Sequence, residues 1–274
     1  MKPRRPSRRP KAPSRLRQIL SASRLGAVVV LAVGLASCAI APSSRYPAKG
    51  DVRPHAGVAS AHGLPVHGVD ISKWQGKVDW AALRQAGTKF AFIKATEGGD
   101  HLDPKFLENW YAAKRAGIAR GAYHFIYWCR PANEQALWFM LNVPPDNDAL
   151  PPVLDLEWNS ASKTCPGKVS RELALQKIKI MLDAMQAHTG KRPIIYTDPK
   201  FHHEVLEGEF PEYHFWLRSV AAEPDAVYLE RPWSFWQFTT TGSVPGVAGR
   251  VDRNSFNGTG ADWDRVLKWL EAGR

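Results

Sequence analysis

The chain has 274 residues and a formal net charge of +11, from 37 Lys and Arg against 26 Asp and Glu. That length allows one barrel-sized domain or two small ones. Residues 1–37 hold nine of the basic side chains and no acidic one, which leaves 28 against 26 in the rest of the chain. Nucleic-acid binding needs a basic face on the folded part, and this distribution argues against one.

The first 37 residues have the order of an export signal. A basic stretch precedes an apolar run of twelve residues, Leu25–Ala36, which is too short to span a bilayer and is typical of a signal-peptide core. The run leads into LASC at residues 35–38, which resembles the bacterial lipobox. That resemblance implies lipidation of Cys38 and an anchor in a bacterial membrane, facing the periplasm or the exterior. The alternatives are a cleaved signal peptide or an uncleaved anchor, with Cys38 incidental.

Residues 38–64 are rich in Ala, Ser, Pro, Gly and His and have no apolar periodicity, which predicts a flexible tether. The folded part is expected to begin near Val66, where the first short apolar run starts. We therefore expect a signal peptide over residues 1–37, the tether over 38–64, and one folded domain over 65–274.

Short apolar runs alternate with helix-length segments in this domain. The predicted strands are Val66–Ile71, Phe90–Lys94, Gly121–Ile126, Val153–Leu156, Ile194–Thr197, Phe215–Leu217, Ser234–Phe238 and a short run near Val251. The predicted helices are Trp80–Ala86, Pro104–Ala116, Asn133–Asn142, Ser170–His188 and Asp262–Glu271. This alternation predicts a single-domain α/β fold, a (β/α) TIM-like barrel. The barrel should be irregular, because the segments after the sixth and seventh strands are rich in Pro and Gly.

Cys129 and Cys165 are the two cysteines that remain once Cys38 is assigned to the lipid. An exported chain meets an oxidising compartment, so we expect a disulfide between them. The alternative is a pair of free thiols.

Two carboxylates follow one predicted strand in the sequence PVLDLEW at residues 152–158. Asp155 and Glu157 are spaced i, i+2, so on a strand they point to one face, roughly 6.5–7 Å apart at Cα. The carboxyl end of a barrel strand is where such folds hold their catalytic groups. Glycoside hydrolysis needs such a pair: an acid that protonates the leaving oxygen, and a carboxylate that supports positive charge at the anomeric carbon. The alternative is a pair that caps a helix or binds a cation.

Further acids lie at two other strand ends, Asp70 in the first predicted strand and Asp252 beside Val251. The first and last strands of a closed barrel are neighbours, so we expect these two acids side by side, across the barrel opening from the fourth strand. The alternative is a local turn role for each Asp.

Aromatic side chains also gather at or just past the predicted strands. They are Trp74, Tyr123, Phe125, Trp128, Trp158, Tyr196, Trp216 and Trp236. Aromatic rings cover the apolar faces of sugars, while polar groups such as Gln237 and His124 read hydroxyls and amides. Each ring alone has core packing as its alternative role, but their concentration at strand ends favours a glycan groove.

Seven motifs in order resemble glycoside hydrolase family 25, the Chalaropsis-type lysozymes. They are GVDISKWQG at residues 68–76, KATEG at 94–98, GAYHF at 121–125, DLE at 155–157, IYT at 195–197, WQF at 236–238 and VDRN at 251–254. The resemblance covers residues 66–270. It implies an irregular (β/α) barrel that cleaves the β-1,4 bond between N-acetylmuramic acid and N-acetylglucosamine in peptidoglycan.

The resemblance also implies roles for the acids. Glu157 would donate the proton to the leaving sugar, and Asp155 would be its partner as nucleophile, as stabiliser of the 2-acetamido group or as a group that orients water. Asp70 and Asp252 would shape the field and position substrate or water. One departure is Arg218, which stands where the family has small residues and an aromatic one after the sixth strand.

Two other functions compete with this one. A chitinase-like hydrolase would have a longer acidic signature at its fourth strand, of which this chain shows only Asp-x-Glu. A catalytically silent peptidoglycan-binding lipoprotein would keep the groove, but all four acids are present. No pattern indicates a metal or cofactor, because His202-His203 followed by Glu204 lacks a zinc-ligand spacing. We expect a monomer that contacts peptidoglycan strands and, through its lipid, a membrane.

Overall fold

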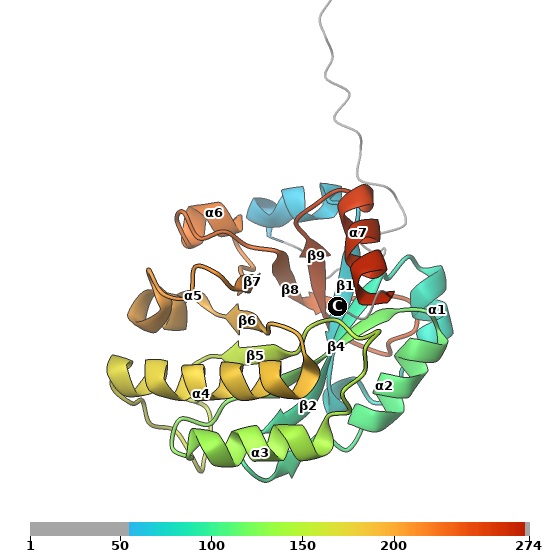
Figure 1. Ribbon diagram of the computed structural model, residues 1–274. Helices are drawn as coiled ribbons and strands as arrows, with labels where there is room; N and C mark the ends of the chain where they lie inside the picture. The colour runs from blue at the N-terminus through green and yellow to red at the C-terminus, as the bar shows by residue number, and fades with distance from the viewer. Residues whose placement is uncertain (1–54, 272–274) are drawn as a thin grey trace, which may run out of the picture. The chain divides into compact units, whose positions relative to one another are not determined.

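The computed structural model describes residues 55–271 of the chain (Figure 1). The predicted signal peptide, the predicted lipidation site at Cys38 and most of the predicted tether lie outside these residues. Within the described part, no helix combines the length and the apolar composition needed to cross a membrane.

A closed ring of eight strands confirms the predicted α/β barrel. In order around the ring these are β1 (His67–Ile71), β2 (Phe90–Glu97), β4 (Ala119–Phe125), β5 (Val153–Leu156), β6 (Ile194–Thr197), β7 (His214–Arg218), β8 (Phe235–Gly242) and β9 (Val251–Phe256). The ring closes because β1 pairs with both β2 and β9. A short strand, β3 (His101–Leu102), pairs with the last residues of β2.

Strand β9 runs against its neighbours. It pairs antiparallel with β8 and β1, while the other pairs around the ring are parallel. The start of β9 therefore lies at the same end of the barrel as the carboxyl ends of the parallel strands. We call this end the mouth; the inward-facing residues there are Asp70, Tyr123, Asp155, Tyr196, Arg218, Gln237 and Asp252.

Helices cover the outside of the ring (Figure 1). They are α1 (Trp80–Gln85), α2 (Phe106–Arg115), α3 (Ala132–Asn142) and α4 (Arg171–Thr189), whereas α7 (Gly260–Glu271) packs against the side chains inside the ring. Ser170 caps the start of α4 by accepting the Leu173 N–H, and Gly190 ends it in the left-handed conformation at φ 70°. Only short helices follow the next two strands. After β6 these are α5 (Pro199–Phe201) and η3 (His202–Leu206), and after β7 it is α6 (Pro224–Val227). The barrel is irregular there, as predicted after β7.

The alternation of side chains along each strand divides the core into two layers. The layer inside the ring consists of Phe90, Phe92, Val153, Ile194, Trp216, Phe235 and Phe256, joined by Trp263 and Leu270 of α7. The layer between ring and helices includes Val69, Ile93, Leu154, Ile195 and Leu217. Because side chains of a strand alternate between faces, Asp155 points into the ring like Val153, two residues before it.

The folded part begins earlier than the sequence predicts. Residues 56–63 form a 3₁₀ helix, η1 (Ala56–Gly63), in which Val58 and Ala61 are fully buried against Trp236 and Phe238. The expectation that the flexible tether extends to residue 64 is therefore wrong at its carboxyl end. Two small apolar side chains are enough to hold this short helix on the outside of β8, and they leave no periodic pattern in the sequence.

Cys129 and Cys165 form a disulfide, with their Cα atoms 5.6 Å apart. Cys129 lies in the segment after β4 and Cys165 in the segment after β5. The bond therefore ties together two neighbouring loops on the mouth side of the barrel.

Candidate active site

Four carboxylates gather at the mouth. Asp70 and Asp252 are register partners on β1 and β9, whereas Asp155 lies in β5 and Glu157 directly follows that strand. Burial raises the pKa of Asp155 and of Glu157, and the charge of Asp70 adds to the shift of both. The structure thus brings together the four acids that the sequence singles out.

Asp70 is held by two amide groups. Its Oδ2 accepts hydrogen bonds from Gln237 Nε2 at 3.0 Å and from Asn254 Nδ2 at 2.8 Å. Gln237 Nε2 also lies 3.4 Å from Asp252 Oδ2, and Gln237 Oε1 accepts from the Tyr196 hydroxyl at 2.9 Å. One buried amide therefore fixes the relative positions of two acids and a tyrosine.

The proton of the Asp70–Asp252 pair has a preferred position. Burial raises the pKa of Asp70, but the hydrogen bonds from Asn254 and Gln237 oppose this shift. Burial, and next the charge of Asp70, raise the pKa of Asp252 to about 9. At neutral pH Asp252 is therefore the protonated member of the pair and donates a hydrogen bond to Asp70.

The Asp155–Glu157 pair also retains a proton. Asp155 is 8% exposed, and among the described residues its Oδ1 has no hydrogen-bond partner. Burial, and next the charge of Glu157, raise its pKa well above the usual value. Burial, and next the charge of Asp198, raise the pKa of the half-buried Glu157 to about 7. A pair that holds a proton near neutral pH meets the requirement for general acid catalysis.

Aromatic side chains line the mouth beside the acids. Burial, and after it the charges of the carboxylates, raise the pKa of the Tyr123 and Tyr196 hydroxyls. Phe125 is half-buried, with Lys94 Nζ 5.2 Å from its ring centre. Trp74, in the short helix η2 (Lys73–Gln75) after β1, is 80% exposed. These surfaces are of the kind that covers the apolar face of a sugar.

Comparison with known proteins agrees with this geometry. The family model for "Glycosyl hydrolases family 25" matches residues 69–247. Lysozyme M1 of Streptomyces globisporus is 37% identical over 207 residues, which are 72% of this chain and 69% of that protein. The protein YegX of Escherichia coli strain K12 is 38% identical over 205 residues, 71% of this chain and 70% of its own.

A solved structure shows the same fold. The family 25 glycosyl hydrolase from Bacillus anthracis has a TM-score of 0.70 and 32% sequence identity, and the match covers 79% of this chain and 99% of that one. The chain belongs to glycosyl hydrolase family 25. It is a glycoside hydrolase, and three of its four mouth acids, Asp70, Asp155 and Glu157, lie within the residues that the family model matches.

The position of His124 in this family 25 hydrolase corrects one prediction. His124 is fully buried and points away from the mouth, between Tyr123 and Phe125, which face it. Its Nδ1 lies 2.8 Å from Thr96 Oγ1 and its Nε2 3.3 Å from Gln135 Oε1 on α3. His124 therefore joins the ring to a helix, and the expectation that it reads a sugar is wrong.

Two tryptophans predicted to contact sugar are also placed elsewhere. Trp216 is 2% exposed, stacks on Phe92 inside the ring and donates its indole N–H to Asn254 Oδ1 at 2.8 Å. Trp158 packs against Trp128 and Phe201, in the layer outside the ring. Trp216 supports the floor of the mouth from below, because side chains two residues apart on a strand stack on the same face.

Gln237 is at the mouth, but in a different role from the predicted one. It is 3% exposed, and its amide is occupied by the two acids and the tyrosine described above. It therefore acts as a positioning residue for the acids rather than as an open donor to sugar.

Two mouth residues are missing from the sequence prediction. Asp198 directly follows β6 and accepts the Phe201 N–H at 2.7 Å, as the cap of α5, while its charge raises the pKa of Glu157. Lys94 of β2 acts on both Asp155 and Glu157 in the opposite direction. The signal for Asp198 was available, because it is one more acid at the carboxyl end of a predicted strand.

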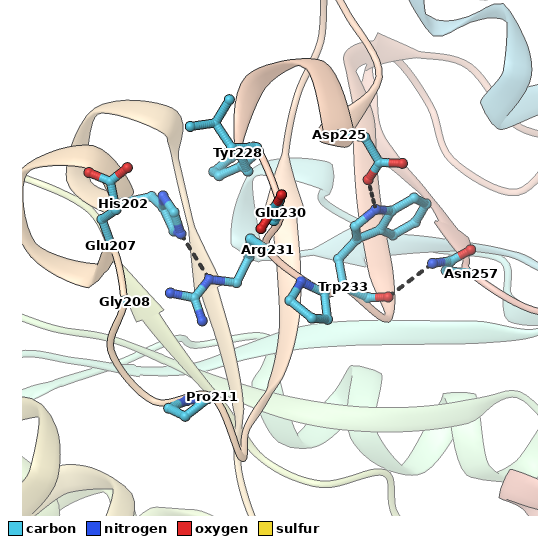
Figure 2. A pocket seen from close by; sticks show the side chains of 12 residues that line it. His202, Glu207, Gly208, Pro211, Asp225, Tyr228, Glu230, Arg231, Trp233 and Asn257 are labelled. Carbon is cyan, nitrogen blue, oxygen red and sulfur yellow. Dashed lines mark hydrogen bonds between the residues drawn. The ribbon is translucent and has the colours of Figure 1, made fainter.

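A cavity of about 1140 Å³ is lined by residues from the segments before β7 and β8 and by Asn257 after β9, and none of the four acids lines it (Figure 2). Figure 2 shows Arg231 directed toward His202, with Nε to Nε2 at 3.0 Å, and Trp233 directed toward Asp225, with Nε1 to Oδ1 at 2.8 Å. Its wall residue Tyr228 donates its hydroxyl to the Arg218 carbonyl at 2.6 Å. The cavity is therefore separate from the site formed by the four acids.

Proposed function

We propose that this glycoside hydrolase cleaves the β-1,4 bond between N-acetylmuramic acid and N-acetylglucosamine in peptidoglycan, with Glu157 as the proton donor. The observation that carries the proposal is the pKa of Glu157, raised by burial and by Asp198 to about 7 in a mouth that holds three further acids. The printed names of the relatives, among them "Lysozyme M1" and "N,O-diacetylmuramidase", support this substrate.

The protonation states suggest which catalytic role each of the four acids has. Asp155 is the buried member of its pair and Glu157 the more exposed one, so the proton they share leaves through Glu157 to the oxygen of the departing sugar. We assign Asp155 the partner role, in which its carboxylate form supports positive charge at the anomeric carbon. Asp70, fixed by Gln237 and Asn254, positions substrate or water, while Asp252 keeps its proton and limits the repulsion between the two acids.

Substrate contacts fall to the aromatic residues that the mouth exposes. Trp74 offers an exposed ring, with Lys73 Nζ 5.1 Å from its centre, and Phe125 a half-buried one. Tyr123 lines the groove between the acids, and the Tyr196 hydroxyl is directed to Gln237. Trp74→Ala should therefore raise KM more than it lowers kcat, because Trp74 is not among the groups that move a proton.

The direct test is mass spectrometry of fragments released from purified peptidoglycan. Muramic acid at the reducing ends is the expected product; glucosamine there would show a glucosaminidase, and an absence of fragments would favour a binding protein. Glu157→Gln should lose turnover by a factor of roughly 10² or more while it still binds the glycan. Exposed Glu108→Gln is the matched control, since Glu108 pairs with Lys105 on the surface of α2.

We further propose that the protein works in the cell envelope as a monomeric, exported lipoprotein. The basic leader, its apolar run and LASC at residues 35–38 support this placement, although all of these residues lie outside the described part. A fatty-acid label should be incorporated by the full chain and not by Cys38→Ala. Light scattering of the soluble domain should give the mass of one chain.

A further inference from the structure

Arg218 is a cation at the mouth that the acids do not neutralise directly. It is the last residue of β7, on the same face as Trp216, and its register partner on β8 is Gln237. The side chain is half-buried. Within residues 55–271, its guanidinium group makes no hydrogen bond and has no carboxylate within the 4.0 Å of an ion pair.

The backbone around Arg218 is fixed on both sides. The Arg218 carbonyl accepts from the Tyr228 hydroxyl at 2.6 Å, and the N–H of the next residue, Ser219, donates to the Gln237 carbonyl at 3.0 Å. The starting point of the side chain is therefore set by the barrel, and the charged end retains its hydrogen-bonding capacity. Such an arrangement holds five N–H donors ready for a planar anion.

Arg218 is also close to the reacting groups. Its charge opposes the rise in pKa that burial causes in Glu157 and in Asp252. Most of the other charged groups at the mouth are acids, which repel an anionic substrate. Lys94, the other cation at the mouth, already pairs with Glu97 at 2.5 Å, so among the described residues Arg218 is the cation left to compensate a substrate carboxylate.

We propose that Arg218 binds a carboxylate of the glycan substrate next to the scissile bond and so makes the enzyme selective for a charged form of the strand. This inference rests on the proposed muramidase function. A guanidinium group matches a carboxylate with two parallel N–H···O bonds.

Two parts of peptidoglycan supply this carboxylate chemistry. The lactyl group of muramic acid ends in a carboxylate only where the stem peptide is absent, because the peptide otherwise occupies it as an amide. The stem peptide itself carries carboxylates further from the sugar ring. If the lactyl group is the source, an enzyme that hydrolyses the lactyl–peptide amide must act before this one.

The test compares three substrates: peptide-free glycan, the same glycan with its lactyl carboxylates converted to neutral methylamides, and intact peptidoglycan. Rates are measured at a pH well below 7, the approximate pKa of Glu157, so that the acid stays protonated in every variant. We expect Arg218→Gln to raise KM for a carboxylate-bearing substrate roughly 10-fold or more, as the loss of a charged hydrogen bond implies, with little change in kcat. KM for the methylamide should not change, and Arg218→Lys should recover part of the loss.

The substrates separate the two sources of the carboxylate. A KM effect confined to peptide-free glycan supports the lactyl group, and one confined to intact peptidoglycan supports the stem peptide. The same KM increase for the methylamide, or no increase for any substrate, would overturn the proposal. Arg171→Gln serves as control, because Arg171 is exposed and pairs with Glu209 on the outside of the barrel.

Calorimetric binding of the same glycans distinguishes failure of this proposal from failure of the proposed function. Wild-type protein that releases no reducing ends would contradict muramidase activity, whatever it binds. The Arg218 proposal would still be decided, because the affinity for the carboxylate-bearing glycan either falls in Arg218→Gln or does not.

Discussion

Asp70 and Asp252 face each other in register on β1 and β9, and they share a proton that Asp252 holds. This arrangement depends on the reversed direction of β9. If β9 were parallel to β1, a residue at its start would lie at the opposite end of the barrel from the carboxyl end of β1. The antiparallel closure therefore contributes the fourth acid of the mouth.

The proton on Asp252 makes stability depend on pH. The pKa of Asp252 is about 9 in the folded protein and about 4 in the unfolded chain, so folding favours the protonated form. Its contribution is fully present below pH about 4 and is lost as the pH rises through about 9. Asp252→Asn imitates the protonated acid, so its free energy of unfolding should fall less between neutral and alkaline pH, by at least about 1.4 kcal/mol, the equivalent of one pKa unit.

Urea denaturation at a series of pH values measures this difference. If the free energy of unfolding changed with pH by the same amount in wild type and Asp252→Asn, Asp252 would titrate alike in the folded and unfolded states. A comparison of Asp252→Asn with Asp252→Ala separates charge from hydrogen bonding. Both variants remove the repulsion, but only Asp252→Ala also removes the contact with Gln237.

The pH dependence of kcat/KM should depend on the pKa of Glu157 and on the charge of its neighbour Asp198. A general acid must be protonated, so kcat/KM should fall as the pH rises through about 7, the pKa of Glu157. Asp198→Asn removes a charge that raises this pKa, so the alkaline limb should move to lower pH by up to about one unit. The amide oxygen of Asn still caps α5, which keeps the local fold. A profile unchanged by Asp198→Asn would mean that another group controls the limb.

Much of this site follows from local sequence patterns. Strands β5 and β6 have the bounds expected from their apolar runs, because strands buried on both faces leave a continuous signal. Alternation then places Asp155 at the mouth. The same rule applied to GAYHF at residues 121–125 places His124 on the opposite face of the strand from Tyr123 and Phe125. The prediction that His124 contacts sugar is wrong because it used only the position of His124 along the strand and not the face of its side chain.

Other features depend on contacts between distant residues. The direction of β9 is set by its pairing with β1 and β8 and not by its own short pattern. Helix η1 is held by Trp236 and Phe238, which lie far away in sequence. The pKa of Glu157 depends on Asp198 and Arg218, which reach the mouth from β6 and β7. Local periodicity carries no information about such pairings.

Gln237 should be essential to the geometry of the acids and not only to stability. Gln237→Met removes the buried amide that contacts Asp70, Asp252 and Tyr196 and leaves Asp70 with the amide of Asn254 alone, so it should lower the free energy of unfolding by about 1–3 kcal/mol and kcat by a larger factor than KM changes. Gln135→Met is the matched control, because Gln135 is buried and bonded to Tyr127 but lies away from the acids. Both variants should lose stability, and only Gln237→Met should lose turnover beyond what unfolding explains; similar kcat values for the two would contradict the positioning role.

The disulfide should support stability more than catalysis. It closes a loop with a sequence separation of 36 residues between Cys129 and Cys165, which in the chain-entropy model stabilises the fold by about 4 kcal/mol. The backbone of Glu157 has its own support, because Trp128 Nε1 donates to the Glu157 carbonyl at 2.7 Å. The double Cys→Ser variant should therefore melt at a lower temperature yet keep most of its kcat well below that temperature. Calorimetry and glycan hydrolysis of the same samples measure the two effects, and the single Cys165→Ser variant should melt like the double one. A variant with unchanged melting but reduced kcat would mean that the bond holds Glu157 rather than the fold.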